Sequence, residues 1–202
     1  MSLVEQDTRV ETFFILHNLH LPRLMTQFSE MLFKRHSIRR YTQQPIPADD
    51  VKTILQAALL APTSKSSRSW QFIVVENRED LEALAKLKPM GAHPIAKATM
   101  AVVVVSDPEK SEAYIEDATV AATYMQLQAE DLGIGSCWIQ VRGRFDANNE
   151  PSEDYVQHLL DIPPYLKVEC VITFGYKDET RRPVDPDKLQ WEKVHIGKYT
   201  KQ

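Results

Sequence analysis

The feature that most constrains this fold is a nearly continuous apolar run, Thr-Met-Ala-Val-Val-Val-Val-Ser, at positions 99–106. Its β-branched residues favour a β-strand. A strand without alternating polar positions is typical of one that is buried on both faces. Together with the strands and helices that are expected to alternate along the rest of the chain, this strand predicts a layered α/β or α+β domain.

The remaining elements are expected around this strand. Further strands are predicted at 70–76, 136–141 and 168–176, because these segments are rich in β-branched and aromatic residues. Helices are predicted at 26–35, between Pro47 and Pro62, and at 78–87, 111–132 and 152–160. The longest helix, 111–132, is expected to end at Gly133.

The composition is that of an ordinary globular protein. The chain has 202 residues, of which 43% are hydrophobic and 26% charged, with a net charge of −4. This length suits one domain, which we place at 26–202, with residues 1–25 as an N-terminal extension. Mild acidity argues against nucleic acid as a partner, and no apolar stretch is long enough to span a membrane. The two cysteines fit no disulfide framework, so a cytoplasmic location is expected.

The common catalytic signatures are missing from the sequence. It has neither a phosphate-binding Gly-x4-Gly-Lys-Ser/Thr loop nor a Gly-x-Gly-x-x-Gly turn, and neither His-Glu-x-x-His nor Gly-x-Ser-x-Gly. The six histidines show no metal-ligand spacing within one element. We therefore expect no metal site and no catalytic side chain.

Two stretches concentrate hydrogen-bond donors instead. In "RHSIR" (35–39), two arginines, a histidine and a serine could point toward one oxyanion, and the arginine fork suits phosphate. In "SKSSRSW" (64–70), serines, a lysine and an arginine lie where a helix gives way to a strand, a common place for ligands. Together they favour a phosphorylated ligand; the alternative is that both are solvated loops.

The order of these motifs resembles the FMN-dependent nitroreductase family. The succession is Arg-His-Ser-Ile-Arg-x-Tyr (35–41), Ala-Pro-Thr-Ser (61–64) running into Trp70, a long alanine-rich helix ending in "LGIGSCWI" (132–139), and an "FGY" strand (174–176). The resemblance covers about residues 28–176 and more weakly 189–199.

The resemblance implies an α+β fold, a three-layer sandwich with a mixed, mainly antiparallel sheet between helices. It also implies an intertwined homodimer with FMN at the interface, in which the tail from about 180 to 202 wraps the partner. Ser66 stands where the family often has Asn, Arg68 where Gln is common, and Ser69 where Pro is usual. The residues that would hold FMN are Arg35, His36, Ser37, Arg39, Pro62, Thr63, Ser64, Ser66, Arg68, Gln140, Val141 and Arg182.

The implied activity is that of an NAD(P)H oxidoreductase. Hydride would pass from NADH or NADPH to FMN N5 and on to a nitroaromatic, quinone or related acceptor, in ping-pong fashion, with the chemistry carried by FMN. Lys65 and Arg68 are the candidates for a cation near flavin N1. The alternatives are a specialised flavin enzyme of the same family, a dehalogenase or flavin-fragmenting enzyme, or a non-enzymatic nucleotide-binding module.

Overall fold

The computed structural model describes residues 26–199, which form two compact units. One unit contains residues 35–181 and carries the sheet; the other joins the segment up to Lys34 to the segment that begins at Arg182. The predicted extension, residues 1–25, lies outside the described residues. The division separates Arg182 from the other predicted site residues, all of which belong to the larger unit.

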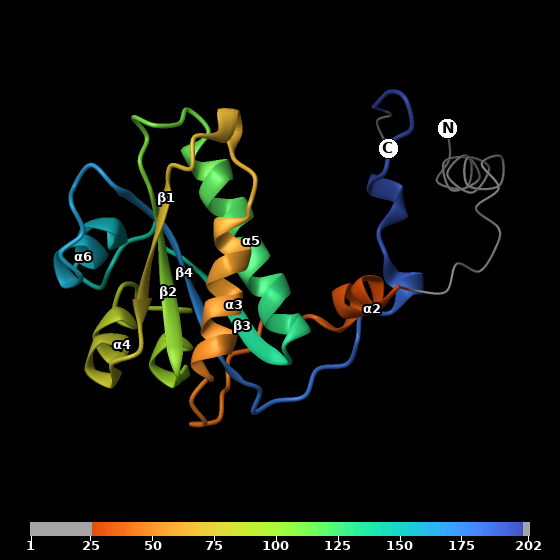
Figure 1. Ribbon diagram of the computed structural model, residues 1–202, viewed down its shortest axis with the longest axis horizontal. Coiled ribbons are helices and arrows are strands. Elements are labelled where there is room, and N and C mark those ends of the chain that lie inside the picture. The colour runs from red at the N-terminus through yellow and green to blue at the C-terminus, as the bar shows by residue number, and fades with distance from the viewer. Residues whose placement is uncertain (1–25, 200–202) are drawn as a thin grey trace. The chain divides into compact units, whose positions relative to one another are not determined.

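The larger unit is built on one antiparallel sheet of four strands in the order β1-β2-β4-β3 (Figure 1). The strands are β1 (Trp70–Val75), β2 (Met100–Ser106), β3 (Ile134–Gln140) and β4 (Lys167–Tyr176). Every residue of β2 is buried, as the apolar run predicted. The parallel component expected of a mixed sheet is confined, in the described residues, to one isolated bridge between Ser37 and Ser136.

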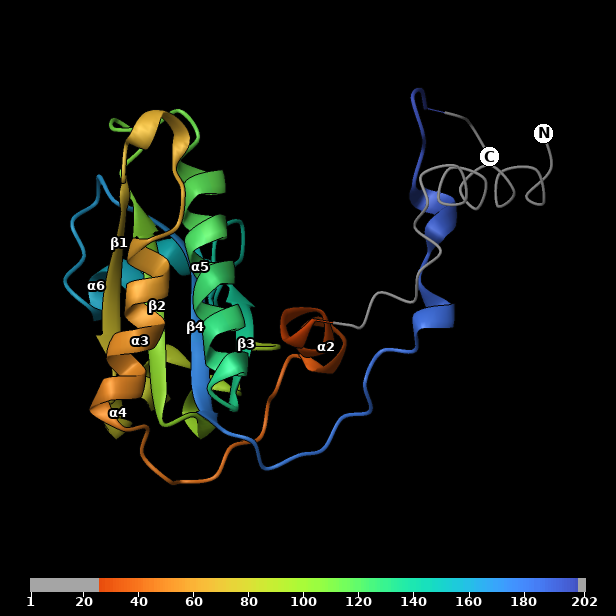
Figure 2. The ribbon, with the colours of Figure 1, turned by 45° about the vertical axis from the view of Figure 1, so that its right-hand side comes forward.

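Helices cover both faces of the sheet, which makes three layers (Figures 1 and 2). Helices α3 (Ala48–Leu59) and α5 (Tyr114–Asp131) pack on one face, where the core includes alternate residues of β2 such as Val102 and Val104. Helices α4 (Arg78–Leu84) and α6 (Ser152–Leu159) cover the other face, over Val103 and Val105. The predicted α+β sandwich is therefore confirmed, and the helices and strands lie where the sequence patterns place them.

The end of α5 follows the expected signal. Its last helical residue is Asp131, and Gly133 has a positive φ of 75°, the left-handed conformation that ends helices at low cost for glycine. The turn delivers the chain directly into β3, the edge strand beside which the first donor-rich stretch lies.

The smaller unit has little core of its own. It contains α2 (Gln27–Lys34), which has no buried residue, and two short 3-10 turns, η3 (Pro186–Lys188) and η4 (Trp191–Lys193). The Val184 N–H donates to the Phe33 carbonyl at 2.8 Å, which ties the two segments together. Its exposed apolar side chains include Phe28, Leu32, Trp191, Ile196 and Tyr199. No helix among residues 26–199 is long and apolar enough to cross a membrane.

Candidate functional site

The segment "RHSIRRY" lies against β3 in the larger unit. The Ile38 N–H donates to the Ser136 carbonyl at 2.9 Å, and Ile38 is buried. A Cβ atom on Gly135 would lie 3.0 Å from Ile38, so this strand position has to be glycine for the segment to approach so closely. The backbone of residues 37–39 is therefore fixed on the sheet while the Arg39 side chain remains exposed.

A buried tyrosine anchors the end of the same segment. The Tyr41 hydroxyl bonds to the Ile38 carbonyl and, at 2.7 Å, to the Thr173 hydroxyl of β4. Burial raises the pKa of Tyr41 well above its usual value, so the hydroxyl keeps its proton. Thr173 also donates to the Cys137 carbonyl at 3.3 Å. This network joins the segment to both β3 and β4.

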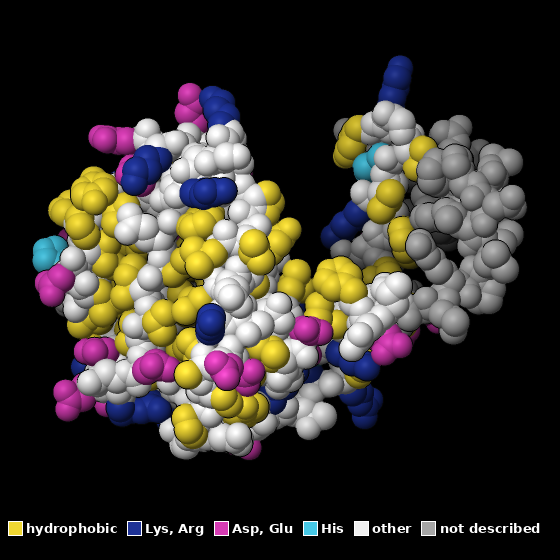
Figure 3. Space-filling model, viewed as in Figure 1, with side chains coloured by type: hydrophobic (Ala, Val, Ile, Leu, Met, Phe, Trp, Pro, Cys, Tyr) yellow, Lys and Arg dark blue, Asp and Glu magenta, His cyan; other side chains and the backbone are white. Residues whose placement is uncertain are grey.

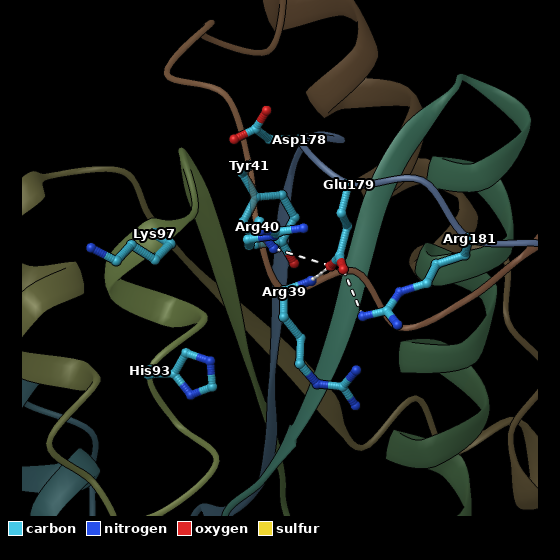
Figure 4. A pocket seen from close by; sticks show the side chains of 8 residues that line it. All are labelled: Arg39, Arg40, Tyr41, His93, Lys97, Asp178, Glu179 and Arg181. Atoms are coloured by element: carbon cyan, nitrogen blue, oxygen red, sulfur yellow. Dashed lines mark hydrogen bonds and ion pairs between the residues drawn. The ribbon is translucent and has the colours of Figure 1, made fainter.

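Glu179 holds the segment from the other side (Figure 4). One carboxylate oxygen accepts the Arg39 N–H at 2.6 Å and the Arg40 N–H at 3.2 Å, and the other accepts from the Arg181 guanidinium at 2.6 Å. Burial alone would raise the pKa of Glu179, but these donors outweigh it and lower the pKa below its usual value. Glu179 is therefore a charged clasp between the segment and the chain after β4.

A cavity of about 540 Å³ opens beside this clasp. Figure 4 shows His93 and Lys97 across the cavity from Arg39 and Glu179. Among the described residues, neither Arg39 nor Lys97 forms a salt bridge, and the nearby Glu179 is already bound to Arg181. The cavity is therefore cationic. Its lining residues are Arg39, Arg40, Tyr41, His93, Lys97, Asp178, Glu179 and Arg181.

The far end of β3 carries the second part of the predicted site. The Gln140 side chain is fixed at both ends: its oxygen accepts from the Trp138 indole at 2.9 Å, and its nitrogen donates to the Arg142 carbonyl at 3.0 Å. The Val141 N–H donates to the Glu169 carbonyl at 3.3 Å and so belongs to the β3–β4 pairing. Cys137, between the two ends of the strand, is buried, and burial raises the pKa of its thiol.

The loop 62–69 has an unusual backbone. Lys65, Ser66 and Arg68 have positive φ values of 51°, 56° and 47°, although none of them is glycine. Left-handed conformation costs such residues about 1–2 kcal/mol each. Backbone strain of this kind persists only where the surroundings enforce it, and it is concentrated at functional sites. The conformation therefore supports a functional role for this loop.

A buried carboxylate enforces that conformation. Asp117, in the first turn of α5, accepts the Ser64 N–H at 2.7 Å, the Ser67 hydroxyl at 3.0 Å and the Ser111 hydroxyl at 2.8 Å. The Arg68 N–H donates to the Thr63 hydroxyl at 3.1 Å. The buried Ser69, which replaces the usual Pro, bonds to the Ser106 hydroxyl at 2.9 Å.

The two donor-rich stretches lie at opposite ends of the sheet within one chain. Ser37 pairs with Ser136 of β3. Ser136 lies opposite Phe174 of β4, and Phe174 lies opposite Met100 of β2, so Ser37 lies at the level of Met100. The loop 62–69 runs into β1 at Trp70, which lies opposite Ser106. From Met100 to Ser106 a strand rises about 20 Å. Figure 2 shows α3 running from one end of the sheet to the other between them.

The structure thus brings Ser37, Arg39, Gln140 and Val141 together along β3, with Arg35 and His36 just before them in the chain. It places Pro62, Thr63, Ser64, Ser66 and Arg68 in the distant loop. The sequence reasoning missed Glu179, Asp117 and Lys88. No local motif marks them, because each acts across a long sequence separation.

Comparison with known proteins agrees with this architecture. The model of the Nitroreductase family matches residues 32–92 and 87–176. These segments include the donor-rich stretches, the long helix and the β3–β4 pair described above. The chain belongs to the nitroreductase family, which confirms the resemblance stated from the sequence.

Two curated relatives and one solved structure illustrate the similarity. A protein of Archaeoglobus fulgidus, provisionally named NADH dehydrogenase/NAD(P)H nitroreductase, is 33% identical over 180 residues, covering 87% of this chain and 100% of that protein. A protein of the same description from Methanothermobacter thermautotrophicus is 34% identical, covering 81% and 86%. The structure of an FMN-dependent nitroreductase from Clostridium difficile R20291 is 42% identical, covers 84% and 99%, and has a TM-score of 0.81.

Proposed function

We propose that the protein is an FMN-dependent NAD(P)H oxidoreductase that reduces nitroaromatic, quinone or related acceptors. The names of its relatives support FMN as the cofactor and NAD(P)H as the electron donor. The observation that carries the proposal for this chain is the arrangement along β3. A fixed backbone presents Ser37 and the unneutralised Arg39 at one end and the immobilised Gln140 at the other.

The donor set fits FMN. A phosphate needs cations and hydrogen-bond donors, and Arg35, Ser37 and Arg39 supply both. Among residues 26–199, no salt bridge includes either guanidinium. From Ser136 to Gln140, β3 rises about 13 Å, which leaves room for an extended ligand. Arg35, His36, Ser37 and Arg39 would hold the phosphate and ribityl chain, and Gln140 and Val141 would flank the ring.

When bound, FMN supplies the hydride chemistry between NAD(P)H and the acceptor. The chain's own residues bind and orient it. Glu179 fixes the backbone of Arg39 and Arg40, and the Tyr41–Thr173 bond fixes the following turn. These contacts fix the backbone from which the Arg39 side chain extends before the ligand arrives, which reduces the entropy lost on binding.

We further propose a homodimer in which the loop 62–69 of one chain completes the site of the other. The strained loop runs into β1, which lies three strand spacings, about 14 Å, from β3, and the loop also lies about 20 Å along the sheet from Ser37. Within one chain it therefore does not adjoin the ligand site on β3. Exposed apolar residues supply surface for a partner: Leu59 in α3, Tyr124 in α5, and Trp191 and Tyr199 in the tail. Figure 3 shows hydrophobic side chains gathered on the face that α3 and α5 form. The tail after Arg182 would wrap the partner.

An absorption spectrum of the purified protein tests the cofactor. We expect a yellow protein that releases FMN and oxidises NAD(P)H with a nitroaromatic or quinone acceptor. Arg39→Ala removes a charge-assisted bond of about 1.5–3 kcal/mol, so the Kd for FMN should rise about tenfold or more. Lys86→Ala is the control, because Lys86 is exposed and lies outside both the predicted phosphate cradle and the cavity. A protein that takes up no added FMN would refute the proposal.

An acceptor screen on the flavin-loaded enzyme separates the reductase from its rivals. Only seven residues, 107–113, connect β2 to α5, which leaves no room there for the lid insertion of a specialised dehalogenase or flavin-fragmenting enzyme. Turnover of halogenated aromatics without reduction of nitroaromatics or quinones would favour a dehalogenase. Flavin binding without any turnover would favour a non-enzymatic module.

Subunit complementation tests the shared site. Arg39→Ala impairs the cradle, and Ser66→Trp places a bulky side chain on the exposed surface of the loop. In a hybrid dimer of these two chains, one site would carry both changes and the other neither. We expect FMN binding at half of the sites. If each site were made by a single chain, every site in the hybrid would be defective, and no tight binding would return.

A further inference from the structure

The cavity of about 540 Å³ has a second wall that lies outside the predicted phosphate cradle. His93 and Lys97 form this wall, beside and within the 3-10 turn η2 (Ile95–Lys97) (Figure 4). Both side chains are exposed, and no salt bridge among residues 26–199 includes Lys97. The cavity therefore has cationic side chains on two opposite walls, of which only Arg39 belongs to the cradle.

The backbone of this second wall is held in place. The Arg78 guanidinium donates to the Ala96 carbonyl at 2.8 Å and to the Ala98 carbonyl at 3.2 Å. Ala98 is buried in one cluster with Ile38 and Tyr41, so η2 is packed against the donor-rich segment on the opposite wall. The fold thus sets the separation of the two walls before any ligand arrives, which reduces the entropy lost on binding.

Two carboxylates line the cavity, but neither neutralises its cations. Both oxygens of Glu179 already accept hydrogen bonds, one from two backbone N–H groups and the other from the Arg181 guanidinium. Figure 4 shows the Asp178 carboxylate on the far side of Tyr41 from the Arg39 guanidinium. The cavity is therefore a concave surface with an excess of positive charge, which attracts an anionic ligand.

The size of the cavity indicates a ligand larger than a lone phosphate. Sites for small molecules have volumes of about 300–1,000 Å³, and this cavity lies within that range. Of the two electron donors considered, NADPH carries a phosphate on its adenosine ribose and NADH carries a hydroxyl there. Proteins bind this phosphate with cations and this hydroxyl with a free Asp or Glu carboxylate. The charges that line the cavity fit the phosphate and not the hydroxyl.

We propose that the cavity binds the 2′-phosphate of NADPH through Arg40, His93 and Lys97, and that the protein therefore prefers NADPH to NADH. This inference rests on the proposed function. From Ser136 to Gln140, β3 rises about 13 Å. A dinucleotide whose nicotinamide lies at the Gln140 end of the strand would extend its adenosine end toward the cavity, which opens at the other end.

The reduction of bound FMN by NADPH or by NADH, followed without an acceptor, tests this preference. The two donors differ only in the 2′-phosphate, so the ratio of their apparent Kd values reports its contacts. We expect the wild-type protein to bind NADPH about tenfold more tightly. Lys97→Met and Arg40→Met should each lower this preference about threefold, and the double variant should abolish it. Lys86→Met is the matched control, because Lys86 is exposed and does not line the cavity.

Equal Kd values for the two donors in the wild-type protein would overturn the inference. An equal loss of affinity for both donors in Lys97→Met would also overturn it, because the cation would then contact a group that NADH shares. The Kd for FMN should stay at its wild-type value in Lys97→Met and Arg40→Met. A rise of about tenfold in both would assign the cavity to the phosphate of FMN instead.

Calorimetry with adenosine 2′,5′-bisphosphate and with 5′-AMP gives a second readout that needs no turnover. We expect the purified protein to bind the bisphosphate about tenfold more tightly than 5′-AMP, and the double variant to bind both alike. Equal binding by the wild-type protein would refute the assignment of the cavity. A protein that took up no FMN but retained the difference would refute the proposed function alone, so the two failures are distinguishable.

Discussion

Asp117 is expected to be the residue on which the loop 62–69 depends most. Its side chain accepts three hydrogen bonds, from the Ser64 amide and the Ser67 and Ser111 hydroxyls, at 2.7–3.0 Å. Bonds to a charged group contribute about 1.5–3 kcal/mol each, so three could reach about 5–9 kcal/mol if they were additive. Ser67 is only half-buried, so its hydroxyl can turn to water. We therefore expect Asp117→Ala to lower the free energy of unfolding by about 3–5 kcal/mol.

Asp117→Asn should cost less, about 1–3 kcal/mol, for a specific reason. The amide keeps one oxygen for the Ser64 N–H, and its NH2 group can donate to serine hydroxyls, which accept as well as donate. Urea unfolding of both variants measures these values from the midpoints, provided that the slopes stay unchanged. FMN affinity should fall together with stability, because the loop would no longer be held in its left-handed conformation.

Glu116→Ala is the control for this series. Glu116 is exposed in the same first turn of α5, so it shares the favourable interaction with the helix dipole without the buried bonds. We expect a loss of less than about 1 kcal/mol. If Asp117→Ala were no more destabilising than Glu116→Ala, the carboxylate would not be what holds the loop, and the argument from strain would lose its basis.

Three further perturbations test other parts of the structure. The pKa of Glu179 is lowered in the folded state, so its ionised carboxylate stabilises the fold at pH values above 4.5, the ordinary pKa of the group. This stabilisation is lost as the pH falls through the folded-state pKa. In Glu179→Gln, the free energy of unfolding should therefore depend less on pH in that range, as acid unfolding curves would show. Ser66→Gly should raise the free energy of unfolding by about 0.5–1 kcal/mol, because glycine adopts a positive φ without strain. Ser64→Gly is the control: Ser64 lies in a helical turn, so glycine there should lower the free energy of unfolding by a similar amount. Urea titration measures both. Gly135→Ala should cost about 1–3 kcal/mol and weaken FMN binding measured by fluorescence, because the new Cβ would press on Ile38.

Much of the fold could be predicted because its signals are local. The apolar run at 99–106 predicted a strand buried on both faces, and every residue of β2 is indeed buried. The long helix ends just before Gly133, whose positive φ is the conformation that the sequence pattern requires. Such patterns depend on residues that are close together in the sequence, so they can be recognised without knowledge of the tertiary structure.

The site could be predicted only in part, because its residues are brought together by the sheet. "RHSIR" was found from its donors, but the clasp that fixes it comes from Glu179, 140 positions further along the chain. The second stretch, "SKSSRSW", was found in the same way. Its place at the opposite end of the sheet follows from strand register, which the sequence does not reveal.

That separation changes what the two stretches mean. The sequence predicted that both stretches bind one phosphorylated ligand. In the structure, one chain presents a cradle at one end of its sheet and a strained loop at the other. A chain gains nothing from maintaining about 1–2 kcal/mol of strain at each of Lys65, Ser66 and Arg68 unless that conformation serves a ligand or a partner. In the homodimer that we propose, two copies related by a two-fold axis would each contribute a loop to the other's cradle, which gives two equivalent sites. The strained loop of one chain and the Arg39 guanidinium of the other would then contact the same ligand, which neither chain could bind fully without its partner.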